Sequence, residues 1–334
     1  MITVTNPPRF LIIQTAFIGD VILATAVLEQ LHQTRPDARL DVLVRKGNEG
    51  LLQGHPFLNE VLVWDKKKKY KSLWQVLQRI RTEPYDAIVN LQRFGTTGLL
   101  TALSNARMTI GFDKNPFSRF FTYALPHHIL PDVHEVDRNR SLLDPLLPQG
   151  AASSRVRPKL YPSAQDYDSI RGYQSTSYVC IAPTSVWYTK QYPAEGWAEL
   201  IDELPTDTTV YLMGAPSDAA ACDAIIAQSG RKKGVENLAG KLKLLQSAAL
   251  MQGAVMNYVN DSAPLHLCSA MNAPTTAVFC STVPEFGFGP LADQSRTVGT
   301  PEPLDCRPCT LHGRSGCPLG HYRCAYSIQP KQLL

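Results

Sequence analysis

The sequence lacks a long uninterrupted apolar run and carries little net charge of either sign. Its apolar stretch at residues 10–28 is interrupted by Gln14, Gly19 and Asp20, and residues 1–8 contain no basic side chain. A membrane-spanning helix needs about 20 consecutive apolar residues and a secretory signal opens with basic ones, so we expect neither. A net charge of +4 gives no reason to expect nucleic-acid binding without a concentrated basic patch. We therefore expect a cytoplasmic protein.

Two glycine-rich phosphate-binding motifs are also absent. Neither G-x-G-x-x-G nor G-x-x-x-x-G-K-[ST] occurs in the 334 residues, which argues against a dinucleotide oxidoreductase and a P-loop enzyme. Asp166 and Asp168 have a D-x-D spacing that suits hard divalent cations. Because this pair lies in a polar segment rather than at the end of a strand, we assign it to solvent.

Length and composition predict a globular chain of two domains. Apolar residues make up 44% and charged residues 19%, which excludes a wholly disordered protein. A chain of 334 residues exceeds what one core usually organises, so two domains of about 150 residues are expected. A polar, proline-rich stretch after Leu147 separates them. We expect a first domain at residues 1–163, a linker at 164–177 and a second domain at 178–334.

Short apolar runs alternate with segments of helical spacing in both halves. The first half has predicted strands at 9–14, 40–44, 61–64 and 87–91, with helices such as 21–32 and 73–80. The second half has predicted strands at 178–182, 210–213, 255–259 and 275–279, with helices at 194–204, 219–229, 244–251 and 263–270. This alternation predicts an α/β fold of two Rossmann-like domains, whose mostly parallel sheets face a central cleft.

Ligands of such sheets bind beyond the carboxyl ends of the strands, so the loops that follow strands are the candidate sites. Four loops stand out, at residues 15–20, 184–190, 214–218 and 260–266. By itself Asp20 fits an ordinary helix cap, and so does Asp261 or Ser262.

Loop 260–266 opens a helix whose N-terminus suits a phosphate, although a plain cap with His266 packed on the helix fits the segment equally well. Thr184, Ser185 and Lys190 occupy the equivalent end of the first strand of the second domain. Two hydroxyls and one ammonium are suited to hold a diphosphate without a metal.

Two further clusters allow alternative interpretations. Lys66, Lys67, Lys68 and Lys69 follow an apolar strand; such a run is usually a solvated loop, but it also suits an anionic lipid surface. Of the eight cysteines, four are isolated in apolar surroundings and are expected in the core, namely Cys180, Cys222, Cys268 and Cys280. The others, Cys306, Cys309, Cys317 and Cys324, leave a structural zinc site, free thiols and a disulfide-prone cluster open.

Taken together, several segments resemble the lipopolysaccharide heptosyltransferases of glycosyltransferase family 9. They are residues 10–20, 190–193 with Trp197, 237–240, 260–266 and 317–324, in this order along nearly the whole chain. The cysteine-rich tail most resembles the branch that adds the second heptose of the inner core. The resemblance implies a GT-B fold, an acceptor-binding first domain and an ADP-heptose-binding second domain. It also implies inversion at the sugar carbon with no catalytic metal or other cofactor.

The resemblance further assigns residue roles. The family's catalytic carboxylate matches Asp20, its phosphate-binding lysine matches Lys190, and its donor loop matches Asp261 and His266. Thr184 and Ser185 match less closely, because the loop to Lys190 carries an extra residue.

The chain departs from the family pattern at two places. Where relatives commonly have glycine after the Asp-Ser pair, this chain has Ala263 after Ser262, so the backbone approaches the diphosphate less readily. Pro216 replaces part of an acidic run, which leaves Asp218 as the candidate for ribose recognition.

The implied partners are the nucleotide sugar and an anionic, lipid-linked saccharide, reached by peripheral contact with the cytoplasmic face of the inner membrane. Two other functions remain as alternatives. One is a nucleotide-sugar epimerase of similar fold, which would consume no acceptor. The other is a non-catalytic nucleotide-binding or zinc-organised protein, in which Asp20 would be dispensable.

Overall fold

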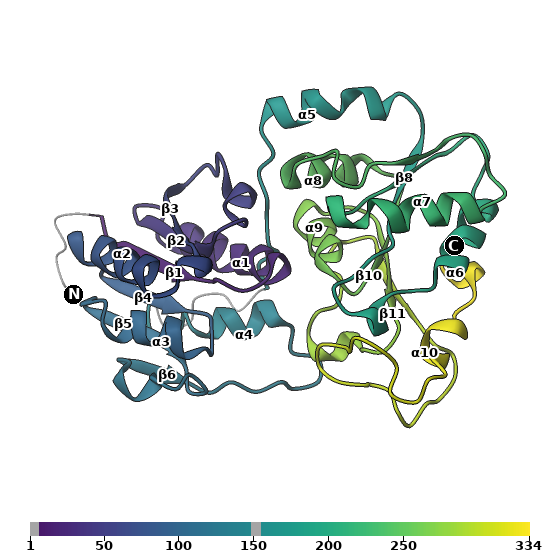
Figure 1. Cartoon of the computed structure of the whole chain (residues 1–334). Helices are drawn as coiled ribbons and strands as arrows, with labels where there is room; N and C mark the ends of the chain where they lie inside the picture. The colour runs from purple at the N-terminus through teal and green to yellow at the C-terminus, as the bar shows by residue number, and fades with distance from the viewer. Residues whose placement is uncertain (1–6, 148–154) are drawn as a thin grey trace. The chain divides into compact units, whose positions relative to one another are not determined.

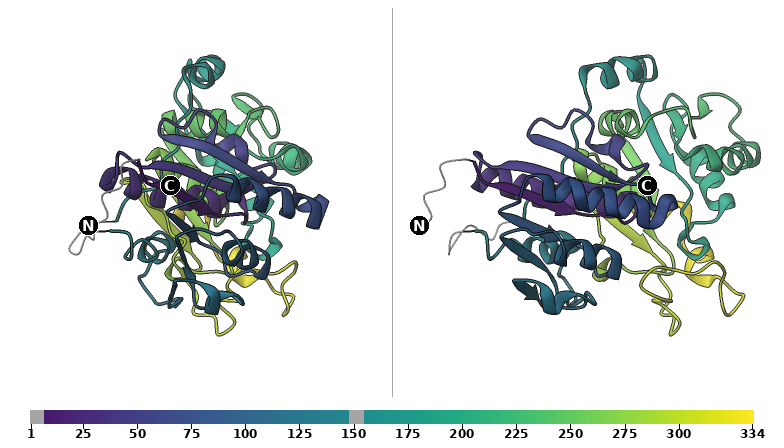
Figure 2. Two further views of the ribbon diagram at one scale, coloured as in Figure 1. Left: turned by 90° about the vertical axis from the view of Figure 1, so that its left-hand side faces the viewer. Right: turned by 60° about the vertical axis from the view of Figure 1, so that its left-hand side comes forward.

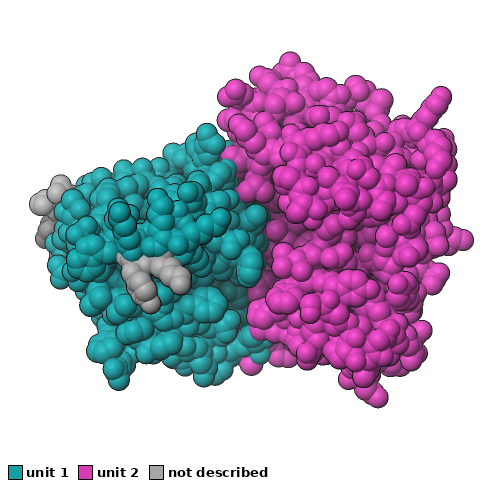
Figure 3. Space-filling view, in the orientation of Figure 1, with its two compact units in different colours: residues 1–129, 135–161 teal, residues 130–134, 162–334 magenta. Residues whose placement is uncertain are grey.

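The computed structural model describes residues 7–147 and 155–334, except for the side chains of Lys69 and Tyr70. The chain divides into two compact units (Figure 3). Unit 1 contains the residues up to 129 together with 135–161, and unit 2 contains 130–134 together with 162–334. The chain therefore passes between the units three times, after residues 129, 134 and 161.

Unit 1 contains a parallel sheet of six strands in the order β3-β2-β1-β4-β5-β6 (Figure 1). Its strands are β1 (Arg9–Ile13), β2 (Arg39–Arg45), β3 (Leu58–Trp64), β4 (Ala87–Asn90), β5 (Met108–Phe112) and β6 (Tyr123–Leu125). Its helices are α1 (Ile18–Thr34), α2 (Lys69–Thr82), α3 (Gly95–Ala102) and α4 (Glu135–Ser141), with short 3-10 turns η1 (Glu49–Leu52), η2 (Lys66–Lys68) and η3 (Ser118–Phe120). The apolar strands β1 and β4 are wholly buried, as expected for the centre of such a sheet.

Unit 2 repeats this architecture with the strand order β12-β11-β10-β7-β8-β9, again all parallel. Its strands are β7 (Tyr178–Ala182), β8 (Thr209–Leu212), β9 (Val235–Asn237), β10 (Met256–Asn260), β11 (Thr275–Phe279) and β12 (Ser295–Gly299). Its helices are α5 (Ala164–Ile170), α6 (Ala194–Glu203), α7 (Ala219–Gln228), α8 (Leu244–Gly253), α9 (Ala263–Met271) and α10 (Arg323–Tyr326). Its 3-10 turns are η4 (Arg171–Gln174), η5 (Tyr188–Lys190), η6 (Pro216–Asp218), η7 (Pro284–Phe286) and η8 (Pro330–Gln332). Helices lie along the sheets, as the turned views show (Figure 2).

Each sheet reverses its strand order beside its first strand. In unit 1 the chain builds outward from β1 toward β3 on one side and from β4 toward β6 on the other. In unit 2 it builds from β7 toward β9 and from β10 toward β12. In unit 1 the loops after β1 and β4 therefore lead away in opposite directions at the carboxyl ends of the strands. The same holds in unit 2 for the loops after β7 and β10. Such sheets bind ligands at this point.

The predicted α/β class with two Rossmann-like, parallel sheets is confirmed. Residues 164–177, expected as a linker, contain α5 and η4, and α5 packs on α8 within unit 2. Asp166 caps α5 by accepting from the backbone N–H of Ser163 (2.9 Å), and Asp168 pairs with Arg171. Both carboxylates of the D-x-D pair thus have local structural partners. In the described part of the chain, no helix combines the length and apolarity that crossing a membrane requires.

Candidate functional site

The loop that leads into α1 of unit 1 is held by three neighbouring strand ends. Lys66 Nζ, after β3, donates to the Thr15 carbonyl at 2.7 Å. Asn48, after β2, donates to the Ala16 carbonyl at 3.0 Å, and the Thr15 hydroxyl donates to Gln92, after β4, at 2.6 Å. The start of α1 is therefore fixed at the switch point of the sheet.

Asp20 is the third residue of α1 and is half-buried. Burial raises the pKa of its carboxyl group, while hydrogen bonds from the backbone N–H groups of Phe17 and Asp20 and the charges of Arg45 and Arg93 act in the opposite direction. A carboxylate with a raised pKa is a better proton acceptor than an ordinary surface aspartate. The position therefore suits a general base as well as a helix cap.

A second carboxylate lies near Asp20. Glu135 begins α4, and burial raises the pKa of its carboxyl group, with the charge of Asp20 acting in the same direction. Arg138 opposes this shift through a buried ion pair at 2.7 Å. Unit 1 thus surrounds Asp20 with an acid and several guanidinium groups that sequence reasoning did not single out.

The carboxyl edge of unit 1 also combines cations with exposed aromatic rings. Arg45 lies 5.0 Å from the ring centre of Phe17, and Arg119 lies 4.7 Å from that of Phe120. Phe17, Phe120 and Phe94 are each more than half exposed. Such a surface suits an anionic ligand that also carries apolar groups.

The predicted lysine run divides into parts with different surroundings. Lys66 lies over the Trp64 ring and holds the Thr15 carbonyl, and burial lowers the pKa of its ammonium group. Lys66, Lys67 and Lys68 are all exposed in η2, and they differ in that Lys66 makes these contacts. The side chain of Lys69 lies outside the described residues. Lys66 therefore supports the loop before Asp20. Lys67 and Lys68 are the lysines of the run that extend into solvent.

In unit 2 the ends of β7, β10 and β11 bring a cation, a carboxylate and a hydroxyl together. Lys190 Nζ lies 2.7 Å from Asp261 Oδ2, and both side chains are largely buried. The Thr282 hydroxyl donates to the same carboxylate oxygen at 2.6 Å. Lys190 is thus held at one position rather than free in solvent.

Asn260 fastens the loops of this site to each other. Its side-chain amide donates to the Pro183 carbonyl at 2.7 Å, and its Oδ1 accepts from the Tyr192 backbone at 2.9 Å. Both ends of the loop that carries Lys190 are therefore hydrogen-bonded to Asn260, the last residue of β10. The predicted hydroxyl residues Thr184 and Ser185 lie within this loop and are half-buried.

The start of α9 completes the site. Ser262 is the N-cap in an extended conformation, and Ala263 and Pro264 are the first helical residues. Exposed backbone N–H groups at a helix start favour an anion, but proline supplies none. The start of α9 therefore has one backbone donor fewer than a helix without proline there. We expect the Lys190 ammonium to contribute to phosphate binding together with the remaining backbone N–H groups.

His266 lies one turn into α9 and is 6% exposed. Burial lowers its pKa to about 3, and the neighbouring charges of His134 and Lys190 act in the same direction. Its imidazole is therefore neutral at physiological pH. Within the described residues its buried Nδ1 has no hydrogen-bond partner.

Asp218 lies apart from this group and serves as a local cap. Its carboxylate accepts from the Ala215 backbone N–H at 2.8 Å before α7 begins. The close approach of Gly214 to Asp218, where a Cβ would lie 2.8 Å from the aspartate Cβ, fixes this turn. A role of Asp218 in ribose recognition stays a prediction.

Sequence reasoning missed Thr282, Thr189 and Ser281. Thr189 is buried, and its hydroxyl accepts from Ser281 at 3.0 Å. Ser281 and Thr282 directly follow β11, so the rule that sites lie after strands could have found them. The contacts of Thr282 with Asp261 and of Ser281 with Thr189 depend on which strands are neighbours, which no local pattern states.

The four C-terminal cysteines line one cavity of about 230 Å³ in unit 2, together with His321, Thr189 and Ser281. They are free thiols. In the part of the chain that the structure describes, no group of three or more His, Cys, Asp and Glu side chains is arranged to hold a metal ion.

Comparison with known proteins agrees with this geometry. The model of the family described as glycosyltransferase family 9 (heptosyltransferase) matches residues 73–318. Lipopolysaccharide heptosyltransferase 3 of Escherichia coli is 30% identical over 284 residues, which cover 80% of this chain and 82% of that protein.

Solved structures show the same fold. A family 9 glycosyltransferase from Veillonella parvula superposes with a TM-score of 0.86 at 21% identity and covers 99% of this chain and 96% of that one. The ADP-heptose lipopolysaccharide heptosyltransferase II of E. coli gives 0.76 at 21% identity, with 97% and 96% covered. The expected likeness to the branch that adds the second heptose gains no support from these identities, since the heptosyltransferase 3 sequence is more similar.

Proposed function

The chain belongs to glycosyltransferase family 9, the heptosyltransferases, and from this premise we propose that it transfers heptose from ADP-heptose to the inner core of lipopolysaccharide. The observation that carries this proposal is the Lys190–Asp261 pair at the switch point of unit 2, beside the start of α9. A cation and a helix N-terminus together suit a nucleotide diphosphate. The relatives' names supply the sugar and the class of acceptor.

Unit 2 binds the donor in this proposal. Asp261, itself held by Thr282, keeps the Lys190 ammonium beside α9, where it pairs with the diphosphate. The hydroxyls of Thr184 and Ser185 and the backbone at Ser262 and Ala263 supply further donors. His266, whose imidazole stays neutral, is the donor-loop histidine of this proposal. Asp218 is the candidate ribose contact.

Unit 1 binds the acceptor and supplies the base. Ionised Asp20 takes the proton from an acceptor hydroxyl, whose oxygen attacks the anomeric carbon opposite the nucleotide. The sugar–phosphate bond breaks in the same displacement, so the configuration inverts. Negative charge grows on the leaving ADP, which Lys190 and the α9 backbone stabilise without protonating it.

Product analysis distinguishes this reaction from the alternatives. The protein is incubated with ADP-heptose and a panel of truncated lipopolysaccharide cores, and both ADP release and heptosylated core are measured. A transferase releases ADP only with the correct acceptor. An epimerase would yield a free sugar or an isomer without acceptor, and a binding protein would release no ADP; either result overturns the proposal.

We expect turnover to proceed without a divalent ion in the donor site, since the Lys190 ammonium and the backbone N–H groups at the start of α9 supply positive charge for the diphosphate. Brief exposure to EDTA should leave ADP release unchanged, and added Mg²⁺ should not increase it. Steady-state rates with and without each reagent test this expectation. Activity lost in EDTA and restored by Mg²⁺ would contradict it.

We propose that the lysines of the 66–69 run assist docking to an anionic acceptor or membrane surface at the cytoplasmic face of the inner membrane. The double variant Lys67→Gln/Lys68→Gln should raise the acceptor KM about three- to tenfold and flatten its dependence on salt. These two lysines are exposed, so stability should not change.

The matched control is Lys232→Gln/Lys233→Gln in unit 2, which removes the same charge from the donor side and should leave the acceptor KM unchanged. Equal effects of the two double variants on KM would show a general charge effect and reject the docking role. Lys66 is left in place because it supports the Asp20 loop.

A further inference from the structure

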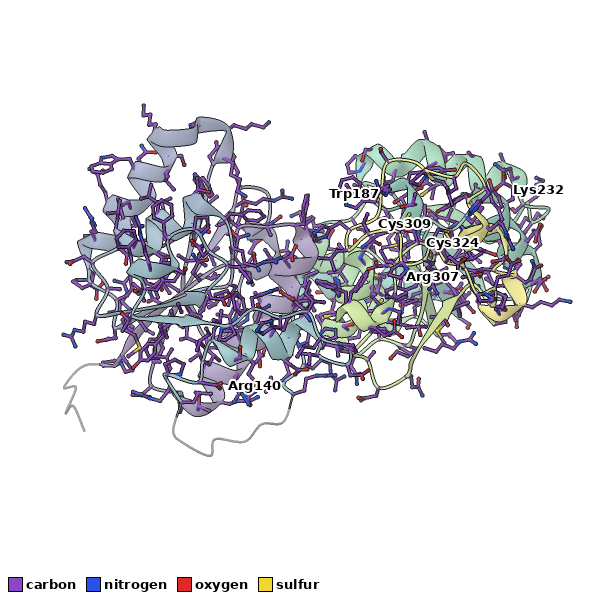
Figure 4. All side chains as sticks on the ribbon, turned by 90° about the horizontal axis from the view of Figure 1, so that it is seen from below. Arg140, Trp187, Lys232, Arg307, Cys309 and Cys324 are labelled. Carbon is purple, nitrogen blue, oxygen red and sulfur yellow. The ribbon has the colours of Figure 1, made fainter. Side chains whose placement is uncertain are left out.

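Exposed aromatic side chains lie on the loops that follow the first strand of each unit. Trp187, labelled in Figure 4, precedes Lys190 in unit 2 and is 38% exposed. The C-terminal segment packs on it, because a Cβ at Gly313 would lie 3.1 Å from Trp187 Cβ. In unit 1, Phe17 stands directly before α1 and is 58% exposed. Packing thus accounts for Trp187, whereas the exposed ring of Phe17 needs another explanation.

Phe17 occupies the N-cap of α1 without capping the helix through its side chain. Serine, threonine, aspartate and asparagine are preferred at this position, because their oxygens accept backbone N–H groups. A phenyl ring has no such acceptor, and the carboxylate of Asp20 instead accepts the backbone N–H of Phe17. Since more than half of Phe17 is exposed, its ring also contributes little to the core. Neither the cap nor the core explains this ring.

The backbone that carries Phe17 is fixed by its neighbours. The Asn48 side chain donates to the Ala16 carbonyl at 3.0 Å, and Gln14 Oε1 accepts from the Ala16 N–H at 3.2 Å. The Phe17 carbonyl accepts from the Val21 N–H at 3.2 Å. A side chain on a fixed backbone loses less conformational freedom when a ligand binds. The ring is therefore preorganised for contact with a ligand.

A cation holds the Phe17 ring from one side. The guanidinium carbon of Arg45, at the end of β2, lies 5.0 Å from the ring centre. The negative face of a phenyl ring attracts positively polarised groups. The C–H groups on the apolar side of a sugar ring are polarised in this way, and the exposed surface of Phe17 is open to them. The ring is therefore suited to pack against a sugar.

Phe17 also lies beside the proposed base. A general base acts within about 2.6–3.2 Å of the oxygen whose proton it removes. Because the N–H of Phe17 bonds the Asp20 carboxylate, a sugar whose hydroxyl reaches this carboxylate is brought next to Phe17.

We propose that the Phe17 ring is the surface against which the acceptor sugar packs while its hydroxyl meets Asp20, with Arg45 holding the ring in place. Phe17 is then a positioning residue of unit 1, and it favours a cyclic sugar over a flexible alcohol as the acceptor. This inference rests on the proposed function, in which Asp20 is the base for a saccharide acceptor.

Steady-state kinetics test this role with the truncated lipopolysaccharide core that the unmodified protein heptosylates fastest. Phe17→Ala should raise the acceptor KM about three- to tenfold, the value of one aromatic contact, and leave the KM for ADP-heptose unchanged. It should also lower kcat, because the hydroxyl is less well aligned. Phe17→Trp should keep both values within about twofold of the parent, whereas Phe17→Leu, which is apolar without an aromatic face, should not. Full activity of Phe17→Ala or Phe17→Leu would overturn the proposal.

Phe120→Ala is the matched control. Phe120 is 55% exposed, and the Arg119 guanidinium carbon lies 4.7 Å from its ring centre, so this change removes the same kind of pair. Phe120 belongs to η3, between β5 and β6, and not to the loop that leads to Asp20. The acceptor KM should therefore stay at the parent value. An equal loss in Phe17→Ala and Phe120→Ala would reject the specific role of Phe17.

The pH profile distinguishes positioning from an indirect effect through Arg45. The charge of Arg45 lowers the pKa of Asp20. A Phe17 variant that merely released Arg45 would therefore move the acid limb of kcat/KM to higher pH, whereas loss of a sugar contact leaves the limb in place. The melting temperature should also stay unchanged, because alanine readily adopts the extended backbone of this N-cap (φ −71°, ψ 168°). A shifted limb or a lower melting temperature in Phe17→Ala would overturn the positioning role.

Failure of this inference can be told apart from failure of the proposed function. Heptose transfer by the unmodified protein, with no loss in Phe17→Ala, overturns the positioning role alone. Absence of transfer to every core of the panel overturns the proposed function and the positioning role with it.

Discussion

Asp20→Asn should lower kcat by about 10²- to 10⁴-fold, the contribution that general-base catalysis typically makes. The amide keeps the shape of the carboxylate but cannot accept the acceptor's proton. Folding and affinity for ADP-heptose should stay nearly unchanged, since asparagine can still accept the backbone N–H groups that Asp20 holds at the start of α1.

Steady-state kinetics at several pH values test this prediction. Since burial raises the pKa of Asp20, the acid limb of kcat/KM should lie above about pH 4, the ordinary range of an aspartate, with activity increasing as pH rises through it. The limb should vanish in Asp20→Asn. Asp166→Asn is the matched control, because Asp166 also occupies the third position of a helix and caps it. A kcat within about threefold of the parent, with unchanged melting, would favour a capping role for Asp20.

Lys190→Gln should reduce kcat/KM for the donor by about 10²- to 10³-fold, as expected when one preorganised donor to the developing charge is removed. It should also lower the melting temperature, because Asp261 is 6% exposed in its side chain and would keep a buried charge without its cation. Loss of activity and loss of stability therefore need to be separated.

The double variant Lys190→Gln/Asp261→Asn separates them. Removing the carboxylate charge should restore the melting temperature, while donor turnover stays low because no ammonium meets the diphosphate. Calorimetry and ADP-release kinetics on the same preparations give both values. Recovery of turnover together with stability would reject the phosphate-binding role of Lys190.

Central strands could be predicted from the sequence alone. The runs at 9–14, 87–91 and 178–182 correspond to β1, β4 and β7, and the strand predicted at 275–279 is β11. The strands β1, β4 and β7 are wholly buried, so most of their residues are apolar and the signal is strong.

The edge strands β6, β9 and β12 could not be predicted, for physical reasons. β6 and β9 have three residues each, and β12 begins with exposed polar residues, because an edge strand is covered on fewer sides. α3 contains two glycines and three threonines, which have poor helix propensity, and forms through its packing beside β4.

For the site, the sequence predicted which loops carry the polar residues but not which side chains meet. Lys190 and Asp261 are 71 positions apart, and their 2.7 Å contact follows from the pairing of β7 with β10. Thr282 joins them because β11 is the next strand. Glu135 near Asp20 depends on α4 packing against α1, a tertiary contact with no local signature.

The repeated crossing of the chain between its units constrains how homologous genes can recombine. Residues 130–134 belong to unit 2, although residues 135–161 return to unit 1. His134 in that segment bonds the Gly289 carbonyl at 3.0 Å and lies near His266. A chimera joined after residue 161 would therefore combine residues 162–334 of one parent with the His134 segment of the other. An exchange that keeps the whole of unit 2 from one parent needs three breakpoints, after residues 129, 134 and 161, rather than one.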